Sequence, residues 1–177
     1  MDGKYIIAID PDCDKSGIAI LNTQTKELSL MCMPFVQLMD YFKGVKETLG
    51  DPPIYVEAGW LIKSHWHIRK GDNIRVSAAK GNSAGRNHEV GRKIVEIIKH
   101  YNLTVFEIPP LPKTYRVGRK RIPIWKGPDG KITHEEFCKE TKYKGKTNQE
   151  CRDAGLIAWR IADAKIWHGR NITTNPI

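Results

Sequence analysis

Two short apolar segments that each end at a carboxylate constrain this chain more than any other feature. The first, KYIIAID, ends at Asp10, and the second, IYVEA, contains Glu57. Such runs predict buried β-strands, and a carboxylate that ends a buried strand needs a partner or water, because burying it alone is expensive. An isolated Asp before a turn more often only caps that turn. Two such strand ends in one chain weaken that explanation for both residues.

The remaining pattern predicts a mixed α/β plan in the order β-β-β-α-β-α-β-α-α. Apolar spacing predicts strands over 4–10, 17–22, 26–33, 54–58 and 103–110, and helices over 35–49, within 78–101, from 133 and from about 148. Thr133 and Glu136 have the spacing of a capping box, and Asn148 or Thr147 can cap the last helix. The Pro-, Gly-, Lys- and Arg-rich stretch 111–131 is expected to be an exposed loop.

Length and composition place the chain among single-domain proteins. A chain of 177 residues fits one domain, expected over 1–168 with a C-terminal tail at 169–177. It has no run of eighteen apolar residues and no signal-peptide pattern at MDGKYIIAID, so a cytoplasmic protein without a membrane partner is expected. No C-x-x-C pair occurs, which argues against zinc and favours reduced packing thiols at Cys13, Cys32, Cys138 and Cys151.

The positive charge is concentrated in the middle of the chain. The formal net charge of +9 divides into −4 over 1–62, +11 over 63–126 and +2 over 127–177. A basic surface attracts a polyanion by releasing its counterions, although a basic segment can also be an ordinary solvated face. Nucleic-acid contacts are predicted at ten basic residues: Lys80, Arg86, Arg92, Lys93, Lys113, Arg116, Arg119, Lys120, Arg121 and Lys131.

A second pair of carboxylates lies near the C-terminus, in TNQECRDAGLIAW. Glu150 and Asp153 are spaced i, i+3, so they share one face of the predicted last helix. Like charges so placed repel, although acidic residues in a first turn also gain from the helix dipole. Mg²⁺ prefers carboxylate and water oxygens and would relieve the repulsion.

These segments together resemble a known family. IIAIDPDCDKSGIAIL, IYVEA and ECRDAGLIAW are similar, in order and spacing, to the acidic strands and final helix of RuvC-type Holliday junction resolvases, and the intervening SAAKGNSAGRNHEVGRKIVEIIKHYNLTVFEIPPLPKTYR is similar to their long helix, next strand and basic loop. The resemblance implies an RNase H-like α/β fold with a five-stranded mixed sheet flanked by helices. It further implies that Asp10, Glu57, Glu150 and Asp153 are catalytic metal ligands.

The resemblance also implies the reaction and its participants. Two Mg²⁺ ions, for which Mn²⁺ can substitute, would support phosphodiester hydrolysis of branched DNA, with Lys113 near the scissile phosphate and Lys131 as a weaker candidate. A homodimer is expected because a four-way junction is cut symmetrically, and no organic cofactor is required. This chain departs from the family in carrying Glu150 where Asp is usual, and Asp12 where a small uncharged residue is usual. Asp12 is either an auxiliary ligand or a turn former, of which we favour the turn.

Several alternatives stay open at this level. The aromatic segment AGWLIKSHWHIRKGDN offers Trp60 and Trp66 either for stacking on bases or, more commonly, for packing, and His65 with His67 lacks a third ligand for a transition metal. The first strand also resembles the phosphate-binding strand of actin-like kinases, which need a longer chain. Nearer alternatives are an RNase H-like nuclease acting on a flap, an RNA-DNA hybrid or structured RNA, and a non-catalytic nucleic-acid-binding protein on the same fold.

Overall fold

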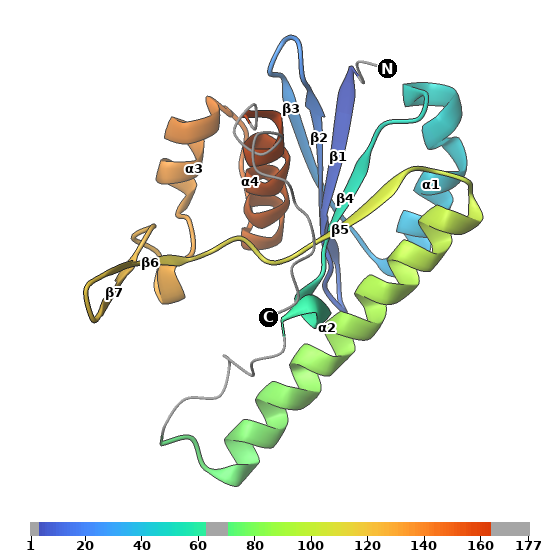
Figure 1. Ribbon diagram of the computed structural model, residues 1–177. Helices are drawn as coiled ribbons and strands as arrows, with labels where there is room; N and C mark the ends of the chain where they lie inside the picture. Colours follow the sequence, from blue (N-terminus) through green and yellow to red (C-terminus); the bar gives the residue numbers. More distant parts are fainter. Residues whose placement is uncertain (1–3, 63–70, 164–177) are drawn as a thin grey trace.

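The computed structural model describes residues 4–62 and 71–163 (Figure 1). The predicted domain boundary at residue 168 and the tail 169–177 lie outside the described residues. Along the chain the elements are β1 (Tyr5–Asp10), β2 (Ser16–Asn22), β3 (Leu28–Met33), α1 (Phe35–Leu49), β4 (Ile54–Glu57), the 3-10 turn η1 (Gly59–Leu61), α2 (Ile74–His100), β5 (Val105–Ile108), β6 (Thr114–Val117), β7 (Lys120–Pro123), the 3-10 turn η2 (Pro128–Gly130), α3 (His134–Thr141) and α4 (Gln149–Asp163).

Five strands form one mixed sheet in the order β3-β2-β1-β4-β5. β1 runs antiparallel to β2 and parallel to β4, which is in turn parallel to β5. β2 also runs antiparallel to β3, so β2 alone is reversed. This strand order, with its single reversed strand and helices on both faces, is that of the RNase H-like fold. The predicted fold class is therefore confirmed.

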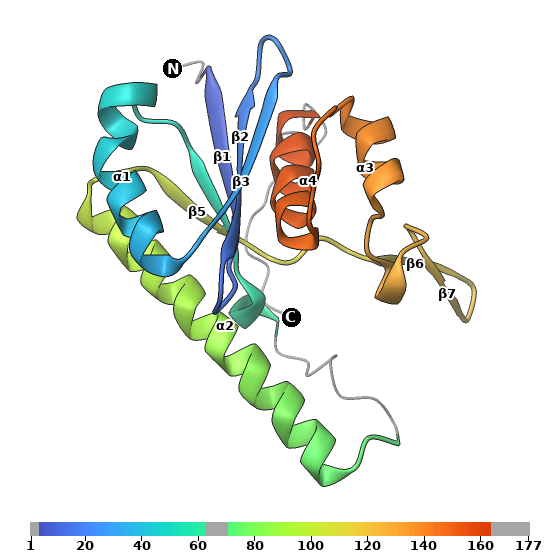
Figure 2. The ribbon, with the colours of Figure 1, turned by 180° about the vertical axis from the view of Figure 1, so that it is seen from behind.

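Helices cover both faces of the sheet, α1 and α2 on one side and α3 and α4 on the other (Figures 1 and 2). Side chains alternate along β1 because successive residues of a strand point to opposite faces. Ile7 and Ile9 belong to the core beneath α1 and α2, whereas Ala8 belongs to the core beneath α4. The α4 side is therefore lined by a small residue in the central strand, which lets that helix approach the sheet closely.

The close approach of α4 depends on two glycines. Gly17 of β2 faces the first turn of α4, where a Cβ would overlap the backbone carbonyl of Glu150. A Cβ on Gly155 of α4 would lie 2.6 Å from the ring of Phe137 and 3.0 Å from the side chain of Leu30. Because Gly17 pairs with Asp10 across β1 and β2, this approach also brings the start of α4 beside the end of β1.

The helix caps and most element boundaries confirm the sequence-based predictions. The capping box is present, since the Thr133 hydroxyl accepts from the Glu136 backbone N–H and the Glu136 carboxylate accepts from that of Thr133. Asn148 is the residue that caps α4, accepting from the backbone N–H of Cys151 at 2.9 Å. None of the described helices combines the length and the apolar character needed to cross a bilayer.

Two boundary predictions were wrong. α2 has 27 residues and begins at Ile74, capped by Asn73, because its exposed first half carries no apolar periodicity that the sequence could reveal. The stretch 111–131, expected to be an exposed loop, contains the hairpin of β6 and β7 and the turn η2. The eight residues of these two strands are largely exposed. Without a buried face, the sequence lacks the regular alternation of apolar and polar residues that predicts a strand.

Substituting Gly17 with Ala is predicted to destabilise the fold. The added methyl group would push α4 away from β2, at a cost of about 1–3 kcal/mol in the free energy of unfolding. Gly44 is the matched control, because it lies in α1 with no atom within 4 Å of the position that a Cβ would take, and Gly44→Ala should stabilise by roughly 0.5–1 kcal/mol. Urea unfolding measures both. Equal effects of the two substitutions would contradict the close approach.

Candidate metal centre

The four predicted carboxylates all line one cleft of about 730 Å³. Asp10 and Glu57 end the parallel neighbours β1 and β4, so both emerge at the same edge of the sheet. Glu150 and Asp153 belong to the start of α4, which reaches this edge because Gly17 lets its first turn contact β2. Carboxylates from β1, β4 and α4, which are far apart in the sequence, thus line one cleft.

Burial and like charge act together on the two strand-ending carboxylates. Burial raises the pKa of Asp10 well above its ordinary value, and the charges of Glu57 and Asp153 raise it further. Burial is also the largest influence on Glu57, whose pKa is raised although Lys113 opposes the change. The two lysines that face this cluster, Lys113 and Lys131, lower both pKa values without cancelling the rise. Burial is thus the main cause of both shifts, in a cleft whose lining holds more carboxylates than lysines.

Asp153 is held in place by its neighbours on α4 and on the preceding loop. One carboxylate oxygen accepts from the Gln149 side-chain amide at 2.7 Å, and the other lies 3.4 Å from the Lys131 ammonium. Arg152 fixes Gln149 in turn, donating to its amide oxygen at 2.8 Å and to the Ile132 carbonyl at 3.1 Å. The sequence-based prediction missed Gln149 and Arg152, although the i, i+4 spacing of Gln149 and Asp153 was a usable signal.

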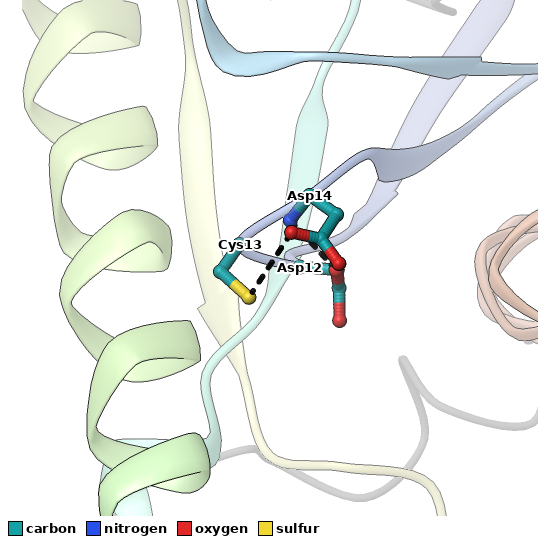
Figure 3. A group of neighbouring side chains, drawn as sticks. All are labelled: Asp12, Cys13 and Asp14. Carbon is teal, nitrogen blue, oxygen red and sulfur yellow. Dashed lines mark hydrogen bonds between the residues drawn. The ribbon is translucent and has the colours of Figure 1, made fainter.

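Asp12 forms the turn between β1 and β2, as favoured from the sequence. One of its carboxylate oxygens accepts from the backbone N–H of Asp14 at 2.9 Å, and the other accepts from the Asn87 side chain at 3.2 Å. Asn87 also accepts from the backbone N–H of Cys13 at 3.1 Å, so this turn is braced against α2. Figure 3 shows Asp12, Cys13 and Asp14 gathered at the turn. Asn87 is a further residue that the sequence did not single out.

Asp12 also lines the cleft, but the acidic groups of its turn lie closer together than the four predicted carboxylates. Within residues 4–62 and 71–163, Asp12, Cys13 and Asp14 form the only group of three acidic, His or Cys residues whose ligand atoms all lie within 4.8 Å of one another. The four carboxylates of the cleft are spread more widely. They line one cavity, and the charges of Glu57 and Asp153 raise the pKa of Asp10, but the four groups are not as close together as those of the turn.

The predicted nucleic-acid-binding residues fall into two sets. Lys80, Lys113 and Lys131 line the cleft together with the carboxylates. Lys80 also pairs with Asp72 at 2.6 Å, and Lys93 pairs with Glu96 at 2.8 Å on the exposed surface of α2. The set that does not line the cleft consists of Arg86, Arg92, Lys93, Arg116, Arg119, Lys120 and Arg121.

Trp60 belongs to η1, packs against α2 and also lines the cleft. Its indole N–H donates to Glu107 at 3.0 Å, and its ring lies where a Cβ on Gly91 would be. The Arg92 guanidinium lies 5.4 Å from the ring centroid, and the ring of His88 meets the indole edge-on with the two centroids 6.2 Å apart. Trp66, His65 and His67 lie outside the described residues.

Comparison with known proteins yields one distant structural likeness. No protein-family model matches the chain, and no curated protein matches its sequence. Among solved structures, the large terminase nuclease from the thermophilic phage G20c is similar over 90% of this chain and 82% of its own, at 14% identity and a TM-score of 0.34. A likeness this distant carries no argument about function, and the fold assignment rests on the strand order given above.

The donor set of the cleft fits a hard divalent cation. All four candidate ligands are carboxylates, and carboxylate oxygens are the ligands that Mg²⁺ and Mn²⁺ prefer. The pKa of Asp10 is raised by burial and by the charges of Glu57 and Asp153, and that of Glu57 by burial and by the charge of Asp153. A bound cation would favour the charged forms, so these residues suit the metal that the sequence predicts.

The raised pKa values predict how stability depends on pH in metal-free protein. A folded-state pKa above the unfolded value means that the folded protein retains a proton that the unfolded chain releases. Stability should therefore fall as pH rises from the ordinary carboxyl pKa through the raised value, and stay low above it. Asp10→Asn removes the buried charge and should raise the Tm at neutral pH in chelator by several degrees, where about 2–4 °C corresponds to 1 kcal/mol.

Added metal should stabilise the unsubstituted protein more than the Asp10→Asn variant. Mg²⁺ or Mn²⁺ should raise the Tm of the unsubstituted protein through linkage, and should raise that of Asp10→Asn far less. Asp40→Asn is the matched control, because Asp40 is exposed on α1 and pairs with Lys43. A metal-induced rise in Tm that is equal in all three proteins would contradict binding at Asp10.

Proposed function

We propose that this protein is a metal-dependent nuclease that acts on DNA. The observation that carries the proposal is the convergence of four carboxylates in one cleft whose rim holds Lys113 and Lys131. We assign Asp10, Glu57, Glu150 and Asp153 as the ligands of two Mg²⁺ ions, with Mn²⁺ as a substitute. A cleft lined by both carboxylates and lysines suits a phosphodiester, because a bound cation and the ammonium groups could both contact its oxygens.

The residues of the chain have separable tasks in this proposal. Bound divalent ions supply an activated water and charge stabilisation for the leaving oxygen in phosphodiester hydrolysis. Asp10 and Glu57 hold their carboxylates at fixed strand ends, and Gln149 orients Asp153 by a 2.7 Å hydrogen bond. Lys113 and Lys131 position the phosphate at the cleft. No Ser or Cys nucleophile is assigned.

Branched DNA is the proposed substrate, and the four-way junction is its most specific form. The support is the resemblance of the three acidic segments to RuvC-type resolvases, together with the ten basic residues predicted to contact nucleic acid. We further propose that the active form is a cytoplasmic homodimer, since a two-fold symmetric enzyme matches a symmetric cut on two strands. Sedimentation of the free protein measures this state directly.

Neutralising a proposed ligand should separate cutting from binding. Asp10→Asn and Asp153→Asn are each expected to reduce cleavage of a four-way junction by about 100-fold or more, since transition-state charge stabilisation of this kind is worth roughly 10²–10³ in rate. Binding, measured by fluorescence anisotropy, should change little. Asp40→Asn serves again as control and should cut normally. Parallel loss of binding and cutting would contradict the metal-ligand role.

A substrate panel tests the finer assignment. The protein should be incubated with four substrates of matched sequence, first with Mg²⁺ and separately with Mn²⁺. The substrates are a four-way junction, a flap, linear duplex DNA and an RNA-DNA hybrid. Preferential symmetric cutting of the junction is expected. Preferential cutting of another panel member would show that the protein is a nuclease with a different substrate. Tight junction binding with no cleavage of any substrate in either metal would instead indicate a non-catalytic nucleic-acid-binding protein.

A further inference from the structure

The segment Thr114–Pro123, here called the basic hairpin, stands apart from the main sheet. Among the strands that the structure describes, β6 and β7 pair only with each other, as a separate two-stranded antiparallel sheet. Figures 1 and 2 show it beyond α3, on the side away from the five-stranded sheet. An isolated two-stranded hairpin is marginally stable in water, and a partner that covers it would stabilise it.

The charges of the basic hairpin are arranged for an external anion. Arg116 and Arg121 lie directly opposite each other across the two strands. Like charges in that position destabilise a hairpin. Among the residues that the structure describes, Arg116, Arg119, Lys120 and Arg121 form no ion pair, whereas Lys80, Lys93 and Lys131 each have one. A polyanion would convert this repulsion into attraction.

The opposite face of the basic hairpin is mainly apolar and exposed, with Lys120 as the cross-strand partner of Val117. Tyr115 and Val117 alternate with Arg116 and are 52% and 55% exposed, and Ile122 is the cross-strand partner of Tyr115. Exposed β-branched and aromatic side chains of this kind can contact base edges and the thymine methyl group. The hairpin thus combines a cationic face with an apolar face on one narrow ribbon.

The base of the basic hairpin is fixed at the rim of the carboxylate cleft. Lys113, which lines the cleft, directly precedes β6, and its carbonyl accepts from the backbone N–H of Ile124 just after β7 at 2.9 Å. Gly130 has a positive φ of 75° and lies against the same carbonyl, which holds the following Lys131 at the cleft as well. α2 contributes Lys80, Ser83 and Asn87 to the other wall. A phosphate at the cleft would therefore belong to a strand that also passes the hairpin.

We propose that the basic hairpin enters the major groove of duplex DNA next to the phosphate held at the cleft. The major groove of B-form DNA is about 12 Å wide and admits a two-stranded β-ribbon, whereas the corresponding groove of A-form RNA is too narrow for side chains to read. The inference rests on the proposed function and deepens it. It assigns recognition of a duplex arm to a segment separate from the carboxylates.

Binding should be measured in the Asp10→Asn background, so that cleavage does not interfere. The test variant is Arg116→Ser with Arg121→Ser, which removes a repulsive cross-strand pair and so should not unfold the hairpin. Its affinity for duplex DNA and for a four-way junction should fall roughly tenfold or more, and its salt slope should fall by about two. Affinity for a single strand of the same sequence should fall much less. Undiminished duplex affinity, or equal losses on duplex and single strand, would overturn the proposal.

The matched control removes two charges from the opposite side of the molecule. The control variant is Lys43→Ser with Lys46→Ser. Both lysines are exposed on α1, across the sheet from the basic hairpin. This variant should bind duplex DNA within about twofold of its parent, because exposed charges far from the contact are screened by salt. A loss as large as that of the hairpin variant would show a general charge effect and overturn the assignment.

Methylation protection distinguishes groove entry from contact with phosphates alone. Guanine N7 lies in the major groove, so dimethyl sulfate should be blocked from one short patch on a bound duplex. That protection should disappear in a Tyr115→Ser, Val117→Ser variant, and its persistence there would overturn groove entry. If protection depends on the hairpin while the unsubstituted protein cuts no nucleic acid, the nuclease proposal fails and the groove contact stands. If no duplex is bound while the unsubstituted protein cuts any nucleic acid, the groove contact fails and the nuclease proposal stands.

Discussion

The close contact between the start of α4 and β2 is the constraint on which the rest of the structure depends. Gly17 lets the Glu150 backbone lie against the strand that pairs with Asp10, and Ala8 and Gly155 keep the same interface thin. Without this approach, α4 could still cover the sheet, but its carboxylates would lie too far from Asp10 and Glu57 to share a cleft. A packing requirement of the core therefore fixes the geometry of the candidate metal centre.

The same contact brings buried carboxylates close together in the cleft. Burial and the nearby charge of Asp153 raise the pKa of both Asp10 and Glu57, and Lys113 and Lys131 offset the rise only in part. Replacing buried acidic groups by neutral ones would stabilise the metal-free fold. A cleft that carries this charge at such a cost in stability is characteristic of a cation-binding site, as perturbed pKa values in a cleft are more generally of functional sites.

The sequence predicted what depends on apolar periodicity and missed what depends on exposed or polar contacts. Asp10 and Glu57 were located because each ends an apolar strand, and Glu150 with Asp153 because the helix that carries them has an apolar face. The basic hairpin and the first half of α2 were missed, since exposed residues carry no burial pattern. Gln149, Arg152 and Asn87 were missed because their roles arise from hydrogen bonds between elements that only the fold brings together.

The location of the bound metal tests the account most directly. Crystals soaked in Mn²⁺ and measured for anomalous scattering would show each ion independently of activity. We expect peaks coordinated by Asp10 together with Glu57, Glu150 and Asp153. Mn²⁺ bound only by Asp12 and Asp14, with no peak at the other four carboxylates, would contradict the metal centre proposed for the cleft.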